Sequence, residues 1–248
     1  MNKVLLITGA SRGIGAATAS LAARHGWRVA VNYAGRADAA AEVVAAIRAA
    51  GGEAEGFQAN VADEAQVLAM FEAIDTRFGR LDGLVNNAGV VDVSARLEDM
   101  SVERWRRMFD INVIGSMLCA RETIKRMRPA LGGHGGAIVN ISSAASRLGS
   151  GGQYVDYAAS KGAIDSLTIG LARELAEDNI RVNAVRPGLI ETEIHASGGL
   201  PDRVNDLKHL VPMKRGGTAD EVAEAIVWLL SDAASYTTMS LLDVSGGR

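Results

Sequence analysis

The sequence has few cysteines and prolines, and both shortages limit what the protein can be. Cys119 is the single cysteine among 248 residues, so no disulfide can form within the chain, and we expect a reducing compartment. There are only four prolines beside 28 glycines. We therefore expect the glycines at tight turns and not in a flexible linker.

The sequence also lacks an excess of positive charge and a long apolar run. The net charge is −3, which argues against a nucleic-acid partner or a membrane-surface partner. The apolar run 225–230 is far shorter than the roughly 18 residues of a membrane span, and the run 4–7 is too short for a signal core. These absences predict a cytoplasmic protein.

Apolar runs rich in Val and Ile alternate with longer segments of helical period. Most of these runs are continuously apolar, as in parallel strands covered on both faces. We predict strands at residues 3–8, 28–33, 53–59, 83–86, 137–142, 181–185 and 241–244, and helices between them at 14–25, 37–50 and 63–78. The pattern predicts an α/β fold in one domain, residues 1–248, with a doubly wound, mostly parallel seven-stranded sheet between two layers of helices.

A glycine-rich loop, residues 8–15, follows the first predicted strand and opens a helix. Gly9, Gly13 and Gly15 permit positive φ angles and allow the backbone to approach a diphosphate closely. The free N–H groups at the start of the helix add a partial positive charge. This position is the one that a Rossmann-type dinucleotide site requires.

The same loop contains a G-x-S-x-G pattern around Ser11, which is also the nucleophile elbow of α/β-hydrolases. A hydrolase needs an acid and a histidine near the same strand ends. His195 and His209 fall in a late loop and a short helix, without a clear acid partner. We therefore prefer the dinucleotide interpretation.

The residues after the second strand favour NADP over NAD. An NAD site usually has an acidic residue at this strand end, but the first acid here is Asp38, on the next helix. Asn32, Tyr33 and Arg36 offer an amide, a phenol and a cation, and Arg12 of the glycine loop lies within reach of the same phosphate. Taken alone, Arg36 fits a solvated surface charge equally well.

Tyr157 and Lys161 are four residues apart, so they share one face of a predicted helix. A tyrosine with its ordinary pKa near 10 is a poor base at neutral pH. We expect Lys161 and an oxidised nicotinamide to stabilise the phenolate and lower this pKa. Tyr157 then exchanges a proton with an alcohol or carbonyl, while Ser143, 14 residues earlier, hydrogen-bonds the reacting oxygen.

From its first strand to its last, the chain resembles the short-chain dehydrogenase/reductase family. The resemblance is carried by the loop 8–15, the stretch 86–89, Asn112, Ser143, Tyr157 with Lys161, and Pro187-Gly188 followed by Thr192. It implies that Tyr157 is the acid/base, that Ser143 positions the substrate, that Lys161 binds the nicotinamide ribose, and that Asn112 holds a water of a proton relay. The implied NADP-binding residues are Gly9, Ser11, Arg12, Gly13, Ile14, Gly15, Asn32, Tyr33, Arg36, Asn60, Val61, Asn87, Ala88, Gly89, Tyr157, Lys161, Pro187, Gly188 and Thr192.

The sequence departs from the family pattern in three places, one of which is the tail, residues 243–247, where the family usually has an acidic residue followed by two glycines. Asn60 stands where an Asp is commoner at the adenine, although its amide oxygen still accepts from the adenine amine. The interval from serine to tyrosine is one residue longer than usual, so Ser142 and Ser143 are both candidates for the serine. We take Ser143, because the segment 148–152 can absorb the extra residue.

The resemblance also implies a substrate lid and an assembly of subunits. The segment 190–213, with its glycines, polar residues and a helix expected from Pro201, is the expected lid, and His195 within it is a candidate substrate contact. The helices at 112–128 and 154–177 carry more apolar positions than one side of a sheet needs. In the family such helices pack between subunits, so we expect a homotetramer.

The sequence therefore predicts an NADP-dependent oxidoreductase that acts on a carbonyl/alcohol pair, with no metal. A reductase of 3-oxoacyl groups on acyl carrier protein and a sugar or polyol dehydrogenase of the glucose 1-dehydrogenase kind are both possible. The net acidic charge argues against docking an acidic carrier, whereas a local patch with Arg128 and Arg173 favours it. The alternative of another class is a catalytically idle NADP-binding sensor on the same fold.

Overall fold

Seven strands form one parallel sheet within residues 3–193, 198–200 and 202–248, which the computed structural model describes. The strands are β1 (Val4–Ile7), β2 (Arg28–Tyr33), β3 (Ala54–Gln58), β4 (Gly83–Asn86), β5 (Gly136–Ile141), β6 (Ile180–Pro187) and β7 (Leu241–Val244). Their order across the sheet is β3-β2-β1-β4-β5-β6-β7. The predicted strands are confirmed, and their ends are shifted by at most two residues.

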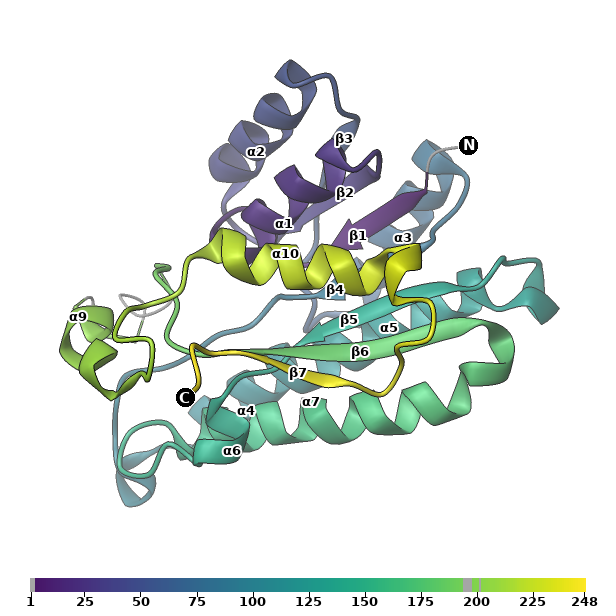
Figure 1. Ribbon diagram of the computed structural model, residues 1–248. Coiled ribbons are helices and arrows are strands. Elements are labelled where there is room, and N and C mark those ends of the chain that lie inside the picture. The colour runs from purple at the N-terminus through teal and green to yellow at the C-terminus, as the bar shows by residue number, and fades with distance from the viewer. Residues whose placement is uncertain (1–2, 194–197, 201) are drawn as a thin grey trace.

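Helices cover both faces of the sheet, which explains why the strands are continuously apolar. The helices are α1 (Gly13–Arg24), α2 (Ala37–Ala49), α3 (Glu64–Phe78), α4 (Val102–Phe109), α5 (Gly115–Met127), α6 (Ala145–Leu148), α7 (Val155–Glu174), α9 (Arg203–Leu207) and α10 (Ala219–Leu230). One core packs α1, α2 and α10 against the sheet, and a second core packs α3, α5 and α7 against its other face. In Figure 1, α10 crosses in front of the strands and α5 lies behind them.

Local signals set the ends of the predicted helices. The Asp63 carboxylate accepts a hydrogen bond from the backbone N–H of Gln66 at 3.1 Å, which caps the start of α3. Gly79 ends the same helix with a φ of +72°, a left-handed conformation that glycine adopts at little cost. The start and stop residues predicted for this helix are therefore confirmed. None of the described helices is long and apolar enough to cross a membrane.

The strand order reverses between β1 and β4. The chain adds β2 and β3 on one side of β1, and then β4 to β7 on the other. In doubly wound sheets the crevice for a ligand lies outside the carboxyl ends of the strands at such a reversal. Thr8, directly after β1, and Asn87, directly after β4, therefore mark the site, and α6 and α9 lie beyond the same end of the sheet (Figure 1).

Candidate active site

Two adjoining pockets lie at the carboxyl ends of the strands. The first pocket runs along the glycine loop and the ends of β2 and β3, and the second surrounds Tyr157. Ile14, Asn87, Gly89 and Thr192 line both pockets. One elongated ligand therefore has room to reach from the loop to Tyr157.

The glycines of the loop permit a tight turn against β4. Gly9 and Gly13 have φ angles of +61° and +54°, and a Cβ atom on Gly9 would lie 2.9 Å from the Cα atom of Ala88. Among the described residues no side chain caps the start of α1, whose first N–H groups lie at the glycine-loop pocket. This donor set fits the diphosphate of a nicotinamide dinucleotide.

Asn32 supports the glycine loop from beneath. Its Oδ1 atom accepts from the Gly9 N–H at 3.1 Å, and its Nδ2 atom donates to the carbonyls of Phe57 and Ala59 at 3.2 and 3.0 Å. The side chain is 1% exposed. The amide expected to meet a 2′-phosphate is thus used within the protein, because the end of β2 is buried, and Asn32 holds the loop instead.

Asn87 and Thr8 join the two halves of the sheet. The Nδ2 atom of Asn87 donates to the carbonyls of Thr8 and Gly9, both at 2.9 Å. The Thr8 hydroxyl oxygen accepts from the N–H groups of Asn87 and Ala88 at 3.0 and 2.9 Å. The sequence analysis gave Thr8 no role, although its place directly after the first strand was a usable signal.

The remaining predicted residues of the first pocket lie around its rim. Ser11, Tyr33, Arg36, Asn60, Val61 and Ala88 all line it. The Arg36 guanidinium is exposed and lies 3.9 Å from the Asp38 carboxylate, whereas Arg12 forms an ion pair of 2.9 Å with Glu193. The sequence analysis did not anticipate Glu193. The Asn60 Oδ1 atom accepts from the Ala62 N–H at 3.1 Å and keeps a second lone pair.

Tyr157, on α7, lies beside Ser143, which follows β5. A hydrogen bond from Ser143 to the phenol lowers the pKa of Tyr157, but burial of the ring outweighs it and raises this pKa above its ordinary value of 10.0. Lys161 is not among the groups that lower the pKa of Tyr157, so the effect expected of this lysine is not found. Spacing along a helix does not reveal how strongly a phenol is desolvated.

Lys161 lies deep between α7 and β5. Its Nζ atom donates to the carbonyl of Ile141 at 2.7 Å and lies 5.6 Å from the centre of the Tyr157 ring. Burial lowers the pKa of Lys161 to about 8, while the charge of Asp165 opposes the shift. The side chain is only 5% exposed, so a proton on it is costly to solvate.

The structure separates the two candidate serines. Ser142 is buried, and its hydroxyl donates to the carbonyl of Lys161 at 3.1 Å. Both serines line the second pocket, but Ser143 is only half-buried, and it is the serine whose hydroxyl lowers the pKa of Tyr157. The short helix α6 and the turn after it, between Ser143 and Tyr157, accommodate the longer interval.

Asn112 lies in a π-helical turn, Asp110–Ile114, that interrupts the path from α4 to α5. Its Oδ1 atom accepts from the Val90 N–H at 2.8 Å, and its Nδ2 atom donates to the Val90 carbonyl and the Ser160 hydroxyl, both at 3.0 Å. Such turns are frequent at functional sites. The Asn112 side chain therefore fixes the backbone of Val90, in the segment between β4 and α4. Its role in holding a water stays a prediction.

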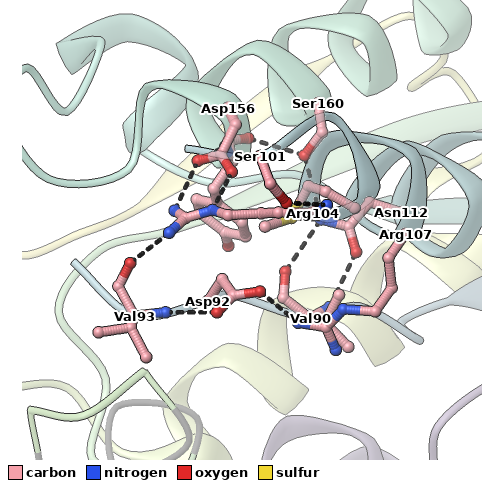
Figure 2. Close-up of polar contacts among 11 residues, drawn as sticks. Val90, Asp92, Val93, Ser101, Arg104, Arg107, Asn112, Asp156 and Ser160 are labelled. Carbon is pink, nitrogen blue, oxygen red and sulfur yellow. Dashed lines mark hydrogen bonds and ion pairs between the residues drawn. The ribbon is translucent and has the colours of Figure 1, made fainter. Parts of the chain in front are cut away.

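A buried ion pair that the sequence analysis missed ties α4 to the start of α7 (Figure 2). The Arg104 guanidinium contacts both carboxylate oxygens of Asp156, at 2.7 and 3.1 Å, and the two side chains are 11% and 2% exposed. Asp156 also accepts from the Tyr157 N–H at 2.9 Å, and Arg104 donates to the Val93 carbonyl. The pair thus fixes the backbone of Tyr157 and one wall of the second pocket.

Residues at the end of β6 and just after it form another wall of the second pocket. Pro187, Gly188 and Thr192 line the second pocket. A Cβ atom on Gly188 would lie 2.7 Å from the Cα atom of Ser245, so only glycine fits there. Thr192 packs against the glycine loop, since a Cβ atom on Gly13 would lie 3.5 Å from its Cγ2 atom. His195, named as a substrate contact, and Pro201 lie outside the described residues.

The hydrolase interpretation of Ser11 receives no support from the geometry. Ser11 lines the first pocket, but among the described residues no histidine lines either pocket. His209 lies in a 3₁₀ turn, Lys208–Leu210, that belongs to neither. Within the part of the chain that the structure describes, the elbow therefore has no histidine as a base.

Comparisons with known proteins agree with this geometry. The model of a family described as enoyl-(acyl carrier protein) reductase matches residues 9–248. The uncharacterized oxidoreductase YgfF of Escherichia coli (strain K12) is 58% identical over 245 residues, which cover 99% of each chain. The 3-oxoacyl-(acyl-carrier-protein) reductase FabG of Staphylococcus epidermidis is 39% identical over 248 residues, covering 100% of this chain and 99% of FabG. A crystal structure of a short-chain type dehydrogenase/reductase from Mycobacterium marinum superposes with a TM-score of 0.93 at 36% identity, covering 99% of this chain and 94% of that one.

Lys161→Met should change how stability depends on pH. With a pKa of about 8 in the folded protein and 10.5 ordinarily, Lys161 binds more protons in the unfolded chain between these pH values. The free energy of unfolding therefore rises with pH in this window, by up to about 3 kcal/mol from this group, and the variant loses that rise. Urea unfolding across the window measures it. Lys208→Met, at an exposed lysine, is the control, and an unchanged pH slope in Lys161→Met would contradict the shifted pKa.

Arg104→Met should destabilise the protein by about 3–5 kcal/mol, because it leaves the buried Asp156 carboxylate without its partner. Arg107→Met removes a more exposed partner of Asp92 from the same helix, so it should cost less than about 1 kcal/mol. Urea unfolding of both variants at neutral pH compares them. Equal losses of unfolding free energy in the two variants would show that the buried ion pair contributes no more to stability than the exposed one.

Proposed function

The chain belongs to the short-chain dehydrogenase/reductase family of oxidoreductases, and we propose that it uses NADPH to reduce a carbonyl, with Tyr157 as the general acid. The observation that carries this proposal is that Ser143 and Tyr157 line one pocket, together with Lys161, and that this pocket adjoins the glycine-loop pocket. A binding-only sensor would have no use for this pair.

The cofactor fits the residues of both pockets. The start of α1 would hold the diphosphate, Asn60 and Val61 the adenine, and Lys161, Pro187, Gly188 and Thr192 the nicotinamide end. When bound, the cofactor supplies the hydride. The other proposed contacts are Gly9, Ser11, Arg12, Gly13, Ile14, Gly15, Tyr33, Arg36, Asn87, Ala88 and Gly89, with Asn32 as the support of the loop.

A protonated Tyr157 fits the reductive direction. Burial keeps the phenol protonated at neutral pH, so it has a proton to donate to the carbonyl oxygen. Ser143 orients this oxygen by a hydrogen bond. Lys161 is mostly protonated at neutral pH, and its charge opposes the desolvation of the phenolate that remains after the transfer. Asn112 positions residue 90 and is the proposed anchor of the proton-relay water.

NADPH is preferred over NADH in this proposal because of the rim of the first pocket. Arg36 is exposed there, and no acidic side chain from β2 or the loop after it, residues 28–36, lines this rim. A guanidinium binds a 2′-phosphate through charge-assisted hydrogen bonds. Arg12 joins it by releasing Glu193, since their exposed ion pair is weak.

We also propose that the chain acts as a single domain and assembles as a homotetramer. Large apolar side chains stay exposed where α4 meets α5: Phe109 at 37%, Ile114 at 45% and Met117 at 46%. An exposed apolar patch of this kind fits a contact between subunits. The cytoplasmic location stays a prediction.

The acyl-carrier alternative loses part of its support. Arg128 forms an ion pair with Asp178 at 2.8 Å, so of the two proposed docking cations only Arg173 has no carboxylate partner among the described residues. A reductase of small carbonyl compounds is the simpler proposal.

Tyr157→Phe should lower kcat by about 10²- to 10⁴-fold while NADPH binding is retained, because the variant loses only the proton donor. Absorbance at the NADPH band follows turnover, and fluorescence titration follows binding. Tyr236→Phe, at a fully exposed tyrosine, is the control. Comparable turnover by Tyr157→Phe and wild type would refute the role.

Arg12→Ala combined with Arg36→Ala should lower the preference for NADPH over NADH by about 10- to 100-fold, the value of one or two charge-assisted hydrogen bonds. The ratio of kcat/KM for the two cofactors measures this preference. Arg24→Ala, at the other end of α1, should leave the ratio unchanged. A ratio that does not fall in the double variant would rule out recognition of the 2′-phosphate by these arginines.

A further inference from the structure

The second pocket has an arginine that the reduction of a carbonyl does not use. Arg203, at the start of α9, lines the pocket. Its Nη2 atom donates to the Oε1 atom of Gln153 at 2.8 Å, and its Cζ atom lies 5.0 Å from the centre of the Tyr154 ring. The guanidinium is therefore held in place by a stack on Tyr154 and by one hydrogen bond.

The charge of Arg203 is not neutralised by the protein. Among the described residues no carboxylate pairs with it, and none of those that line the second pocket is an Asp or a Glu. The neighbouring Arg104, by contrast, is paired with Asp156. Both arginines face Tyr154, and their charges oppose the rise in its pKa that burial causes. The outer end of this pocket is therefore positive.

We propose that the substrate carries a carboxylate, which Arg203 binds while its carbonyl lies at Tyr157; the proposal rests on the proposed carbonyl reduction. The remaining N–H groups of the guanidinium match the two oxygens of a carboxylate. The substrate class is an oxo acid.

A purely structural role for Arg203 predicts other kinetics than the binding of a carboxylate. If the residue only holds α9 against Gln153 and Tyr154, its loss affects charged and neutral substrates alike. If it binds a carboxylate, its loss affects the acid and spares the ester of the same carbon skeleton. Pairs of an oxo acid and its methyl ester therefore separate the two roles.

The experiment measures kcat/KM with NADPH for pyruvate, acetoacetate and laevulinate and for their methyl esters, which vary the distance between carbonyl and carboxylate. Wild type should prefer at least one acid to its ester by about tenfold or more. Arg203→Gln should lower kcat/KM for that acid by about 10- to 100-fold and change the ester less than about twofold. Arg203→Lys should retain part of the preference, and Lys208→Gln, which removes an exposed charge just after α9, should retain all of it.

Ligand-observed NMR with laevulinate and its methyl ester, in the presence of NADP⁺, measures the same preference without turnover. Binding of the acid that Arg203→Gln abolishes, with no effect on the ester, supports the carboxylate site even if no compound is reduced, in which case the proposed reduction fails. Reduction of the esters as fast as the acids, or equal losses for both in Arg203→Gln, overturns the carboxylate site and leaves the reduction standing.

Discussion

The site depends on the hydrogen bonds that the Asn87 amide forms across the reversal in strand order. Its two donors hold the carbonyls of Thr8 and Gly9, so the glycine loop from β1 is fixed to the end of β4. Asn32 holds the same loop from the side of β2. Because these amides are used inside the protein, the N–H groups at the start of α1 are left for a ligand, and the second pocket begins where the first one ends.

Burial sets the chemistry of the second pocket. Desolvation raises the pKa of Tyr157 above its ordinary value of 10.0 and lowers that of Lys161 from 10.5 to about 8, so the lysine becomes the stronger acid of the two. The phenol therefore keeps its proton at neutral pH, and the neighbouring lysine loses its own more easily. The buried pair of Arg104 and Asp156 keeps the backbone of Tyr157 in this position.

Much of the fold and part of the site could be predicted from the sequence. Continuous apolar runs located the strands, and Asp63 and Gly79 marked the ends of α3, because these signals are local. The choice of Ser143 over Ser142 also rested on local spacing, and its catalytic role stays a prediction. The role of Asn32, the partner of Arg12 and the pKa of Tyr157 could not be predicted, since each depends on groups that are distant in sequence, such as Phe57, Glu193 and the elements that bury the phenol.

The parts of the second pocket come from different segments of the chain. The proposed proton donor, Tyr157, and its neighbours belong to α7 and the end of β5, which are anchored in the core of the sheet, whereas Arg203 belongs to the short helix α9 outside it. If the two proposed roles hold, we expect exchange of α9 to alter which compounds are accepted without disturbing how they react. Mutations in α9, whether natural or engineered, would then change the substrate while the core of the sheet, and with it the stability of the fold, is preserved.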